Sequence, residues 1–339
     1  MILKKEEIKT LIKGTSLFTT GGGLPFQYQI EQLNKFNDDI EVILKDPKDF
    51  LKDSYLMTVS GLGPASGQDI DKKNVIKKML EYFQLITNRT VSGLYAVELG
   101  QETITAEASY LLNLPIADFD CSGGRAVPCV DITSFNVTNI NYHYSPLVVC
   151  TDREEIIILE GNKGLERTED IMRQLSRLSD SGVIFMMGEC VKVDDILGTD
   201  VINNSYSKCL EYGKINSIDE FIKKENPKKY WKNIEVLECV EKEKSGFSFK
   251  KVRFITSNKE IYNMIILNEV LFILDKDNKM VYSIPDKILL VNSEKMIGVQ
   301  SSQIKKGDHF SIIITEPDLA WRGESGKKVF GVNRFKELL

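Results

Sequence analysis

The chain has 339 residues, 42% hydrophobic and 27% charged, so it can bury a large core and is too long for one comfortable single-core domain. A formal net charge of −5 excludes the basic excess that a phosphate-binding surface normally needs, so we expect no nucleic-acid partner. The N-terminal segment carries Glu6 and Glu7 where a signal peptide would be apolar, and no apolar run approaches the roughly 20 residues that span a bilayer, which predicts a cytoplasmic protein without membrane association.

Strand-like and helix-like segments alternate over the first two thirds of the chain, which is typical of an α/β layer structure. The first expected helix, over 6–19, carries Ile8, Leu11, Ile12 and Leu17 on one side. The other elements expected here are helices over 25–36, 71–87, 103–114, 170–182 and 203–214, the last with an asparagine or serine cap, and strands over 39–46, 54–63, 91–100, 115–120 and 183–193.

Beyond about residue 230 the pattern changes to period-two alternation with turn residues. It predicts a hairpin around Ser245 and Gly246 and further strands over 263–291, joined at 275–279. We therefore expect an α/β domain over 1–214, with a mixed or parallel sheet and flanking helices, that carries the site. A mostly β domain over 215–339 follows, with the option that the C-terminal tail packs back on the first domain.

Cysteine and histidine usage limits the metal and redox chemistry. The six cysteines include no C-x-x-C pair, so we expect reduced thiols rather than a disulfide framework or a thiolate zinc site. The two histidines, His143 and His309, are too few for a histidine-rich metal centre.

Four segments of the first domain, here called breaks, share one pattern. In each, an apolar segment is followed by glycines or acids just before a helix or turn. They lie at 19–25, 60–67, 97–103 and 118–126. Ligands of open α/β sheets collect outside the carboxyl ends of the strands, so we expect the four breaks to meet at one cleft.

Gly21, Gly22 and Gly23 precede the expected second helix. Their backbone N–H groups are suited to a substrate carboxylate or phosphate that the helix dipole also favours, and a turn between two helices is the simpler alternative. The lysine and hydroxyl of a Walker loop are missing, which disfavours a nucleotide-binding enzyme.

Three carboxylates are the catalytic candidates. Glu98 ends an apolar strand, where limited solvent would raise its pKa toward the range useful for proton transfer, unless it only accepts backbone N–H bonds. Asp118 and Asp120 are two residues apart and share a face of an ideal strand, so they are suited to acid–base work or to a divalent metal, the one cofactor considered. Glu189 is a weaker candidate for the same cleft.

Gly124 and Arg125 follow this acidic pair. Arg125 is suited to a two-point clamp on a substrate carboxylate, with a salt bridge to Asp118 or Asp120 as the alternative. Cys121 is a possible nucleophile, although no histidine is near it in sequence and a buried inert thiol is the commoner case.

Several segments together resemble one family. They are "GTSLFTTGGGLP", "ELG", "LPIADFDCSGGRAVP" and "GTDVINNSYSKCLEYGK", with "NEVLFILD", "IPDKILLV" and "KKVFG" in the second domain. The chain is similar over nearly its whole length to the S-methyl thiohydantoin desulfurase-like family, two-domain proteins associated with hydantoinase and oxoprolinase subunits. The family's glycines, strand-end acid and D-x-D followed by G-R-A correspond here to Gly21, Gly22, Gly23, Glu98, Asp118, Asp120, Gly124, Arg125 and Ala126.

The resemblance implies a hydrolase that acts on a small hydantoin-like or S-methyl thiohydantoin-like compound, with water displacing a thiol or opening an amide-like bond. The chain departs from the family pattern at Leu24, Gln101, Thr103, Cys121 and Cys129, so another ligand is an alternative. The rival hypothesis is a non-catalytic small-molecule-binding or accessory subunit of a hydantoinase-type system. The expected partners are a small-molecule substrate and either a second copy of the chain or a hydantoinase-type protein.

Overall fold

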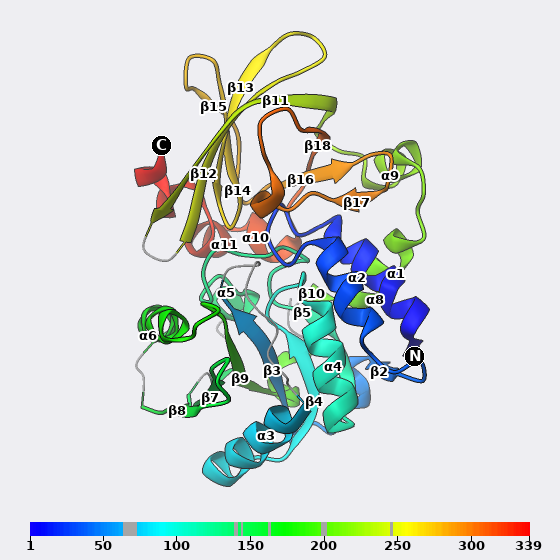
Figure 1. Cartoon of the computed structure of the whole chain (residues 1–339), viewed down its shortest axis with the longest axis vertical. Coiled ribbons are helices and arrows are strands. Elements are labelled where there is room, and N and C mark those ends of the chain that lie inside the picture. Colours follow the sequence, from blue (N-terminus) through cyan, green and yellow to red (C-terminus); the bar gives the residue numbers. More distant parts are fainter. Residues whose placement is uncertain (64–72, 139–141, 144, 162–163, 198–201, 245–246) are drawn as a thin grey trace.

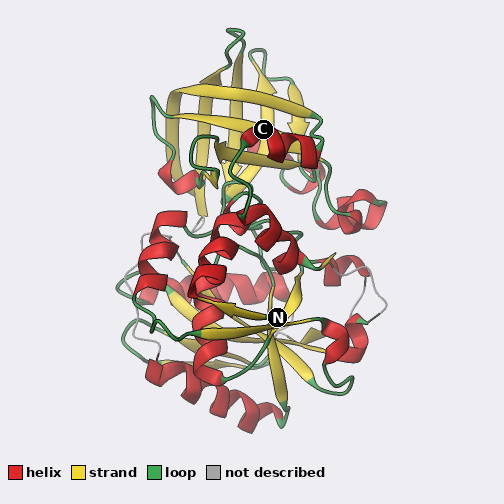
Figure 2. Ribbon diagram, turned by 90° about the vertical axis from the view of Figure 1, so that its right-hand side faces the viewer, coloured by secondary structure: helices red, strands yellow, loops and turns green. Residues whose placement is uncertain are grey.

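A computed structural model describes residues 1–63, 73–138, 142–143, 145–161, 164–197, 202–244 and 247–339. Two sheets are built from these residues, one with helices around it and one nearly free of them (Figures 1 and 2). This confirms the predicted fold class, an α/β part followed by a mostly β part. None of the helices in the described ranges is long and apolar enough to cross a membrane.

The first sheet is mixed. Its central strands β2, β5, β4 and β3 are parallel neighbours, and β9 pairs antiparallel with β3. In the described residues its order is β1 (Ile2–Lys4), β2 (Glu41–Lys45), β5 (Ile116–Asp120), β4 (Val91–Ala96), β3 (Tyr55–Leu62), β9 (Ile184–Lys192), β7 (Leu147–Cys150) and β8 (Ile156–Leu159), with β10 (Ile202–Asn203) on β5 and β6 (Tyr142–His143) on β9.

Helices surround this sheet, and the predicted apolar face of the first one is buried. Ile8, Leu11, Ile12 and Leu17 are all at most 3% exposed, because helix α1 packs into the main core of the first domain. The helices are α1 (Lys5–Ser16), α2 (Phe26–Asn34), α3 (Lys73–Thr87), α4 (Glu102–Leu112), α5 (Ser134–Thr138), α6 (Leu165–Leu178), α7 (Val193–Ile196), α8 (Ser205–Gly213) and α9 (Ile218–Glu225).

The second sheet is antiparallel throughout its described pairs. The predicted hairpin is present as β11 and β12, which pair up to Lys244 and Phe247, while its turn at 245–246 lies outside the described residues. The order is β15 (Met280–Ser283), β14 (Glu269–Asp275), β13 (Ile261–Leu267), β12 (Phe247–Ile255), β11 (Lys229–Lys244), β18 (His309–Thr315), β16 (Lys287–Asn292) and β17 (Ile297–Gly298).

Apolar packing joins the two sheets. Leu289, Val291 and Ile313 of the second sheet belong to the same core as helix α1. The C-terminal helices α10 (Leu319–Arg322) and α11 (Glu324–Val329) contact α5, and the Trp321 indole N–H donates to the Ser122 carbonyl at 3.0 Å. The C-terminal segment therefore lies against the turn that follows β5.

Candidate active site

A cleft of about 1140 Å³ opens at the carboxyl ends of β3 and β4. Each of the four sequence breaks brings residues to its wall. These are Gly22–Pro25, Ser60–Gly63, a set around Glu98 and Gln101, and Ala126 with the residues that follow it. Residues 64–67 of the second break lie outside the described part of the chain.

The glycine segment forms one wall of this cleft. Gly22 and Gly23 line it, whereas Gly21 turns toward the second sheet, where its carbonyl accepts a hydrogen bond from the Ser301 N–H at 2.6 Å. The Gly22 N–H donates to the Thr19 carbonyl at 2.9 Å. The Gly22 N–H, one of those predicted to bind an anion, is therefore hydrogen-bonded within its own turn.

Close packing explains why Gly22 carries no side chain. A Cβ atom on Gly22 would lie 2.6 Å from the Cβ of Ala126, a distance that real Cβ contacts do not reach. Beside it, the Leu24 N–H donates to the Gly100 carbonyl at 2.8 Å. The first, third and fourth breaks are therefore held together by direct contact.

Glu98 lies on the cleft wall between the end of β4 and the start of α4, and it is half-buried. Removal from water raises the pKa of its carboxyl to about 8, against hydrogen bonds from Gln101 and the Val127 backbone that lower it. Repulsion from Glu269 and Glu169 adds to the rise. Glu98 is therefore a carboxyl group that can hold a proton near neutral pH inside the cleft.

Gln101 connects Glu98 to strand β3. Its amide nitrogen donates to Glu98 Oε1 at 3.3 Å, and its amide oxygen accepts from the Gly61 N–H at 2.8 Å. The side chain is thereby oriented with its nitrogen toward the carboxyl group.

Asp118 does not line the cleft; it holds the start of helix α8. Its Oδ1 accepts from the backbone N–H groups of Tyr206 at 2.9 Å and Ser207 at 3.1 Å, and its Oδ2 accepts from the Ser207 hydroxyl. We expected a local asparagine or serine to cap this helix, but Asn204 at the cap position makes no side-chain cap bond. The distant aspartate replaces it because β5 contacts α8, with the Asn204 N–H donating to the Asp118 carbonyl at 2.8 Å.

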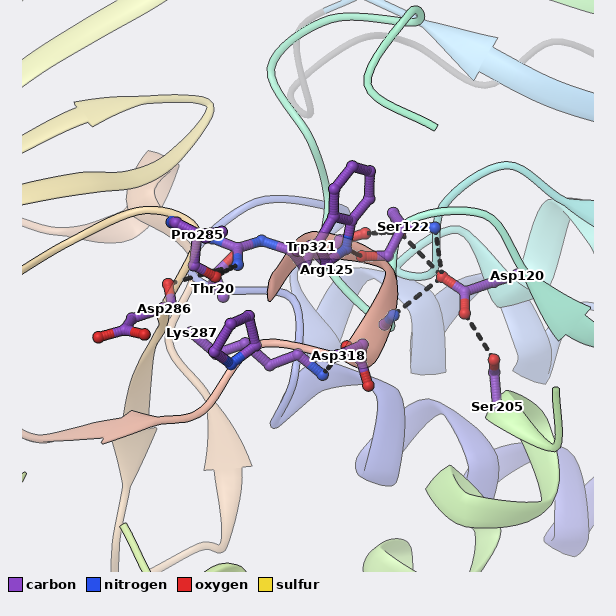
Figure 3. Close-up of polar contacts among 12 residues, drawn as sticks. Thr20, Asp120, Ser122, Arg125, Ser205, Pro285, Asp286, Lys287, Asp318 and Trp321 are labelled. Atoms are coloured by element: carbon purple, nitrogen blue, oxygen red, sulfur yellow. Dashed lines mark hydrogen bonds and ion pairs between the residues drawn. The ribbon is translucent and has the colours of Figure 1, made fainter. Parts of the chain in front are cut away.

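Asp120 is completely buried and also lies away from the cleft wall. Its Oδ2 accepts from the Ser122 N–H, the Ser122 hydroxyl and the Gly124 N–H, and its Oδ1 accepts from the Ser205 hydroxyl at 2.5 Å (Figure 3). Burial raises the pKa of this carboxyl, and these bonds lower it. Gly124, predicted to contact substrate, donates its N–H to Asp120 within this turn.

The aspartates fit a metal poorly. A cation would have to displace the N–H and O–H donors that now occupy both carboxylates, and the backbone N–H groups among them cannot serve as metal ligands. Among the described residues, no group of three or more histidine, cysteine, aspartate or glutamate side chains is arranged to hold a metal ion.

Arg125 is fully buried where the two sheets meet and does not line the cleft. Its Nε and Nη2 donate to Glu269 Oε2 at 3.0 and 2.8 Å, and its Nη1 donates to the Pro285 carbonyl at 2.6 Å. The salt-bridge alternative named Asp118 or Asp120 as the partner; the observed partner is Glu269, from the second sheet. In this geometry no guanidinium N–H faces the cleft.

Glu189 of β9 and Glu169 of α6 also lie on the cleft wall. Burial and repulsion from Glu169 raise the pKa of Glu189 to about 7. Glu169 accepts from the Val130 N–H at 2.7 Å and from the Arg173 guanidinium at 2.7 and 2.9 Å. Glu189 had a weak sequence signal as an acid inside an apolar strand. Glu169 had no such signal, because a glutamate on a helix is usually a solvent-exposed charge.

The second domain also contributes to the cleft. Asn268, Ser301, Ser302, Gln303, Glu241 and Lys242 line it from loops and strands of the second sheet. Nothing in the sequence singles out these polar residues, since surface turns are rich in the same types.

Comparison with known proteins decides the family. The S-Me-THD-like N-terminal domain matches residues 6–161, and the S-Me-THD-like C-terminal domain matches residues 163–336. The chain belongs to the S-Me-THD-like family. The resemblance deduced from the sequence motifs is thereby confirmed.

The S-Me-THD-like fold is shared with a solved structure. A crystal structure of a protein from Chromobacterium violaceum superposes with a TM-score of 0.75 at 14% sequence identity, covering 100% of this chain and 97% of that one. This likeness concerns the fold alone. No curated protein matches the chain.

Both S-Me-THD-like domains contribute residues to the cleft. The match to the C-terminal one begins at residue 163, so α6 and β9, which carry Glu169 and Glu189, belong to it, whereas Glu98 belongs to the N-terminal one. The cleft therefore combines carboxyl groups from both family domains.

Proposed function

We propose that this protein is a hydrolase that acts on a small S-methyl thiohydantoin-like compound, with water displacing methanethiol. The observation that carries the proposal is Glu98, a cleft carboxyl whose pKa is raised to about 8. Membership of the S-Me-THD-like family supports the thiohydantoin class of substrate. A carboxyl that stays protonated near neutral pH is suited to general acid catalysis.

The chemistry asks for a proton donor at the ring nitrogen. Water forms a C–O bond to the carbon that carries the S-methyl group, and the C=N electron pair moves to nitrogen, which takes the proton of Glu98. The C–S bond then breaks with its electron pair on sulfur, which takes up the other proton of the water and leaves as methanethiol. Glu98 recovers a proton from the new hydroxyl as the ring carbonyl forms, so the carboxyl is regenerated for the next turnover.

The other predicted residues receive supporting roles in this proposal. Gly22 and Gly23 form the wall beside the ring, and Gln101 orients Glu98. We assign Asp118 and Asp120 to holding α8 and the glycine turn, because their carboxylates are occupied by N–H and O–H donors. Arg125 is assigned to holding the second domain against the first.

Methanethiol release from S-methyl thiohydantoin tests the proposal. Headspace gas chromatography separates the product from the six thiols of the protein itself. We expect turnover by the wild type, with and without added divalent metal, and a loss of about 100-fold or more in Glu98→Gln. Binding of the compound by calorimetry without any methanethiol supports the rival, a non-catalytic binding subunit, and overturns the proposal.

A further inference from the structure

We propose that Glu189 is the second catalytic carboxyl of this cleft, taking the proton of the attacking water and delivering it to the departing methanethiolate. The inference rests on the proposed function and completes it, because Glu98 alone accounts only for the protons at the ring nitrogen and the carbonyl oxygen.

Strand β9 carries an extra residue where it passes the cleft. Thr58 of β3 pairs with Gly188, and Leu56 pairs with Val191, so two steps along β3 correspond to three along β9. This irregularity is a β-bulge, a feature that re-aims a side chain and is common beside active sites. The bulge contains Glu189.

The backbone of Glu189 is in the left-handed region. Its φ is 49°, in a strand whose other non-glycine residues avoid positive φ. A non-glycine residue held there costs of order 1–3 kcal/mol, and it persists where the surroundings enforce it. The Tyr95 hydroxyl donates to the Glu189 carbonyl and contributes to holding this conformation.

The residue before it must be glycine. Gly188 has φ 154°, and a Cβ there would lie 2.5 Å from Leu147 Cδ2 and 3.1 Å from the Pro146 carbonyl oxygen. The Thr58 hydroxyl donates to the Gly188 carbonyl at 3.2 Å. The bulge is therefore supported on both sides, and it presents Glu189 to the cleft with 6% of that residue exposed.

Few charged groups act on this carboxyl. Glu169 of α6 repels it, and the Thr58 side chain hydrogen-bonds to it. The thiols of Cys121 and Cys190 lie near enough to feel its charge, and burial raises the pKa of both, so they stay neutral at physiological pH. Glu189 therefore has no cationic partner among these neighbours, as expected of a group that must exchange a proton rather than hold a salt bridge.

The proton balance closes with two carboxyls. Glu189 begins ionised, takes one proton from water as the C–O bond forms, and returns it to sulfur as the C–S bond breaks. Glu98 begins protonated, gives its proton to the ring nitrogen and regains one from the hydroxyl. Each turnover consumes water and releases methanethiol, and both side chains end as they began.

The experiment measures methanethiol release against pH for the wild type, Glu189→Gln and Glu98→Gln. The wild type should show a bell limited by Glu189 on the acidic side, near 7, and by Glu98 on the basic side, near 8. Glu189→Gln should lose about 100-fold or more in kcat while still binding substrate, and its residual rate should lack the acidic limb.

Two further variants complete the test. Glu154→Gln is the matched control, because Glu154 also has a positive φ, at 61°, but is exposed and outside the cleft; it should retain the wild-type rate and profile. Thr58→Val removes the hydroxyl that lowers the pKa of Glu189 and that also contacts the Gly188 carbonyl, so the acidic limb should move to higher pH. This shift of the acidic limb tests the role of Glu189 even if Glu189→Gln does not fold.

If the wild type turns over and Glu189→Gln keeps the full rate, the role of Glu189 is overturned and the proposed function stands. The same holds if the wild type turns over and Thr58→Val leaves the acidic limb in place. A wild type that releases no methanethiol overturns the proposed function itself. The two failures are therefore distinguishable.

Discussion

Arg125 and Glu269 form an ion pair in which both side chains are fully buried, and the pair joins the turn after β5 to the start of β14. Glu269 also accepts from the Thr20 hydroxyl, one residue before the glycine segment, and the Thr20 carbonyl accepts from the Val270 N–H at 2.9 Å. The wall of the cleft is thereby tied to the second sheet through one carboxylate.

Breaking this pair should destabilise the protein strongly. Arg125→Met leaves Glu269 as a buried charge without its counterion, which costs roughly 3–5 kcal/mol. The double variant Arg125→Met with Glu269→Gln should lose less than the sum of the two single variants. Chemical denaturation measures the free energy of unfolding of all three.

An exposed pair is the matched control for that experiment. Arg153 and Asp180 are also 2.8 Å apart, but their side chains are 62% and 66% exposed. Arg153→Met should therefore cost far less than Arg125→Met. Equal losses of unfolding free energy in Arg125→Met and Arg153→Met would show that the buried pair contributes no more to stability than the exposed one.

Glu98 should make the protein less stable as pH rises. The folded state holds a proton on this carboxyl up to about pH 8, whereas an ordinary glutamate has a pKa of 4.5. Folding therefore binds protons within this window, and the stability present below pH 4.5 is progressively lost toward pH 8. The melting temperature of Glu98→Gln should fall less between these limits, with a gain relative to the wild type of up to about 5 kcal/mol at the upper one, since each pKa unit corresponds to about 1.4 kcal/mol. Identical pH dependence in both proteins would contradict the raised pKa.

Gly22 should not tolerate a methyl group. Gly22→Ala places a Cβ within 2.6 Å of Ala126, so the two breaks must separate, at a cost of roughly 1–3 kcal/mol and with weaker substrate binding. Gly323→Ala is the control, since no heavy atom lies within 4 Å of its added Cβ. Thermal unfolding and calorimetric binding of both variants check this, and a neutral Gly22→Ala would refute the close contact.

Asp118 should matter more for stability than for chemistry. Asp118→Ala removes the acceptor of two backbone N–H groups at the start of α8, which should cost about 1–2 kcal/mol. Asp118→Asn keeps one acceptor oxygen and should lose less. We expect kcat to change far less in Asp118→Asn than in Glu98→Gln. A turnover loss as large as that of Glu98→Gln, with unchanged unfolding, would return Asp118 to the catalytic candidates.

Local patterns were sufficient for the individual elements. The helical spacing of Ile8, Leu11 and Ile12 predicts the buried face of α1, and the apolar run before Glu98 predicts strand β4. Short strands were missed, among them β1 and β10, because they hold two or three residues and are set by their pairing partners rather than by local pattern. The two-residue spacing of Asp118 and Asp120 indicates one shared face, and both side chains do reach helix α8.

The sequence by itself determined the family, the two-part fold class and the breaks from which the cleft is built, since glycines, strand-end acids and periodicity are local signals. Only the tertiary structure decided what each charged side chain contacts. Arg125 meets Glu269 across 144 positions of sequence, and the bulge that presents Glu189 arises from the register of β9 against β3. Charge pairing and strand register depend on which segments fold against each other. Local sequence patterns therefore predict neither of them.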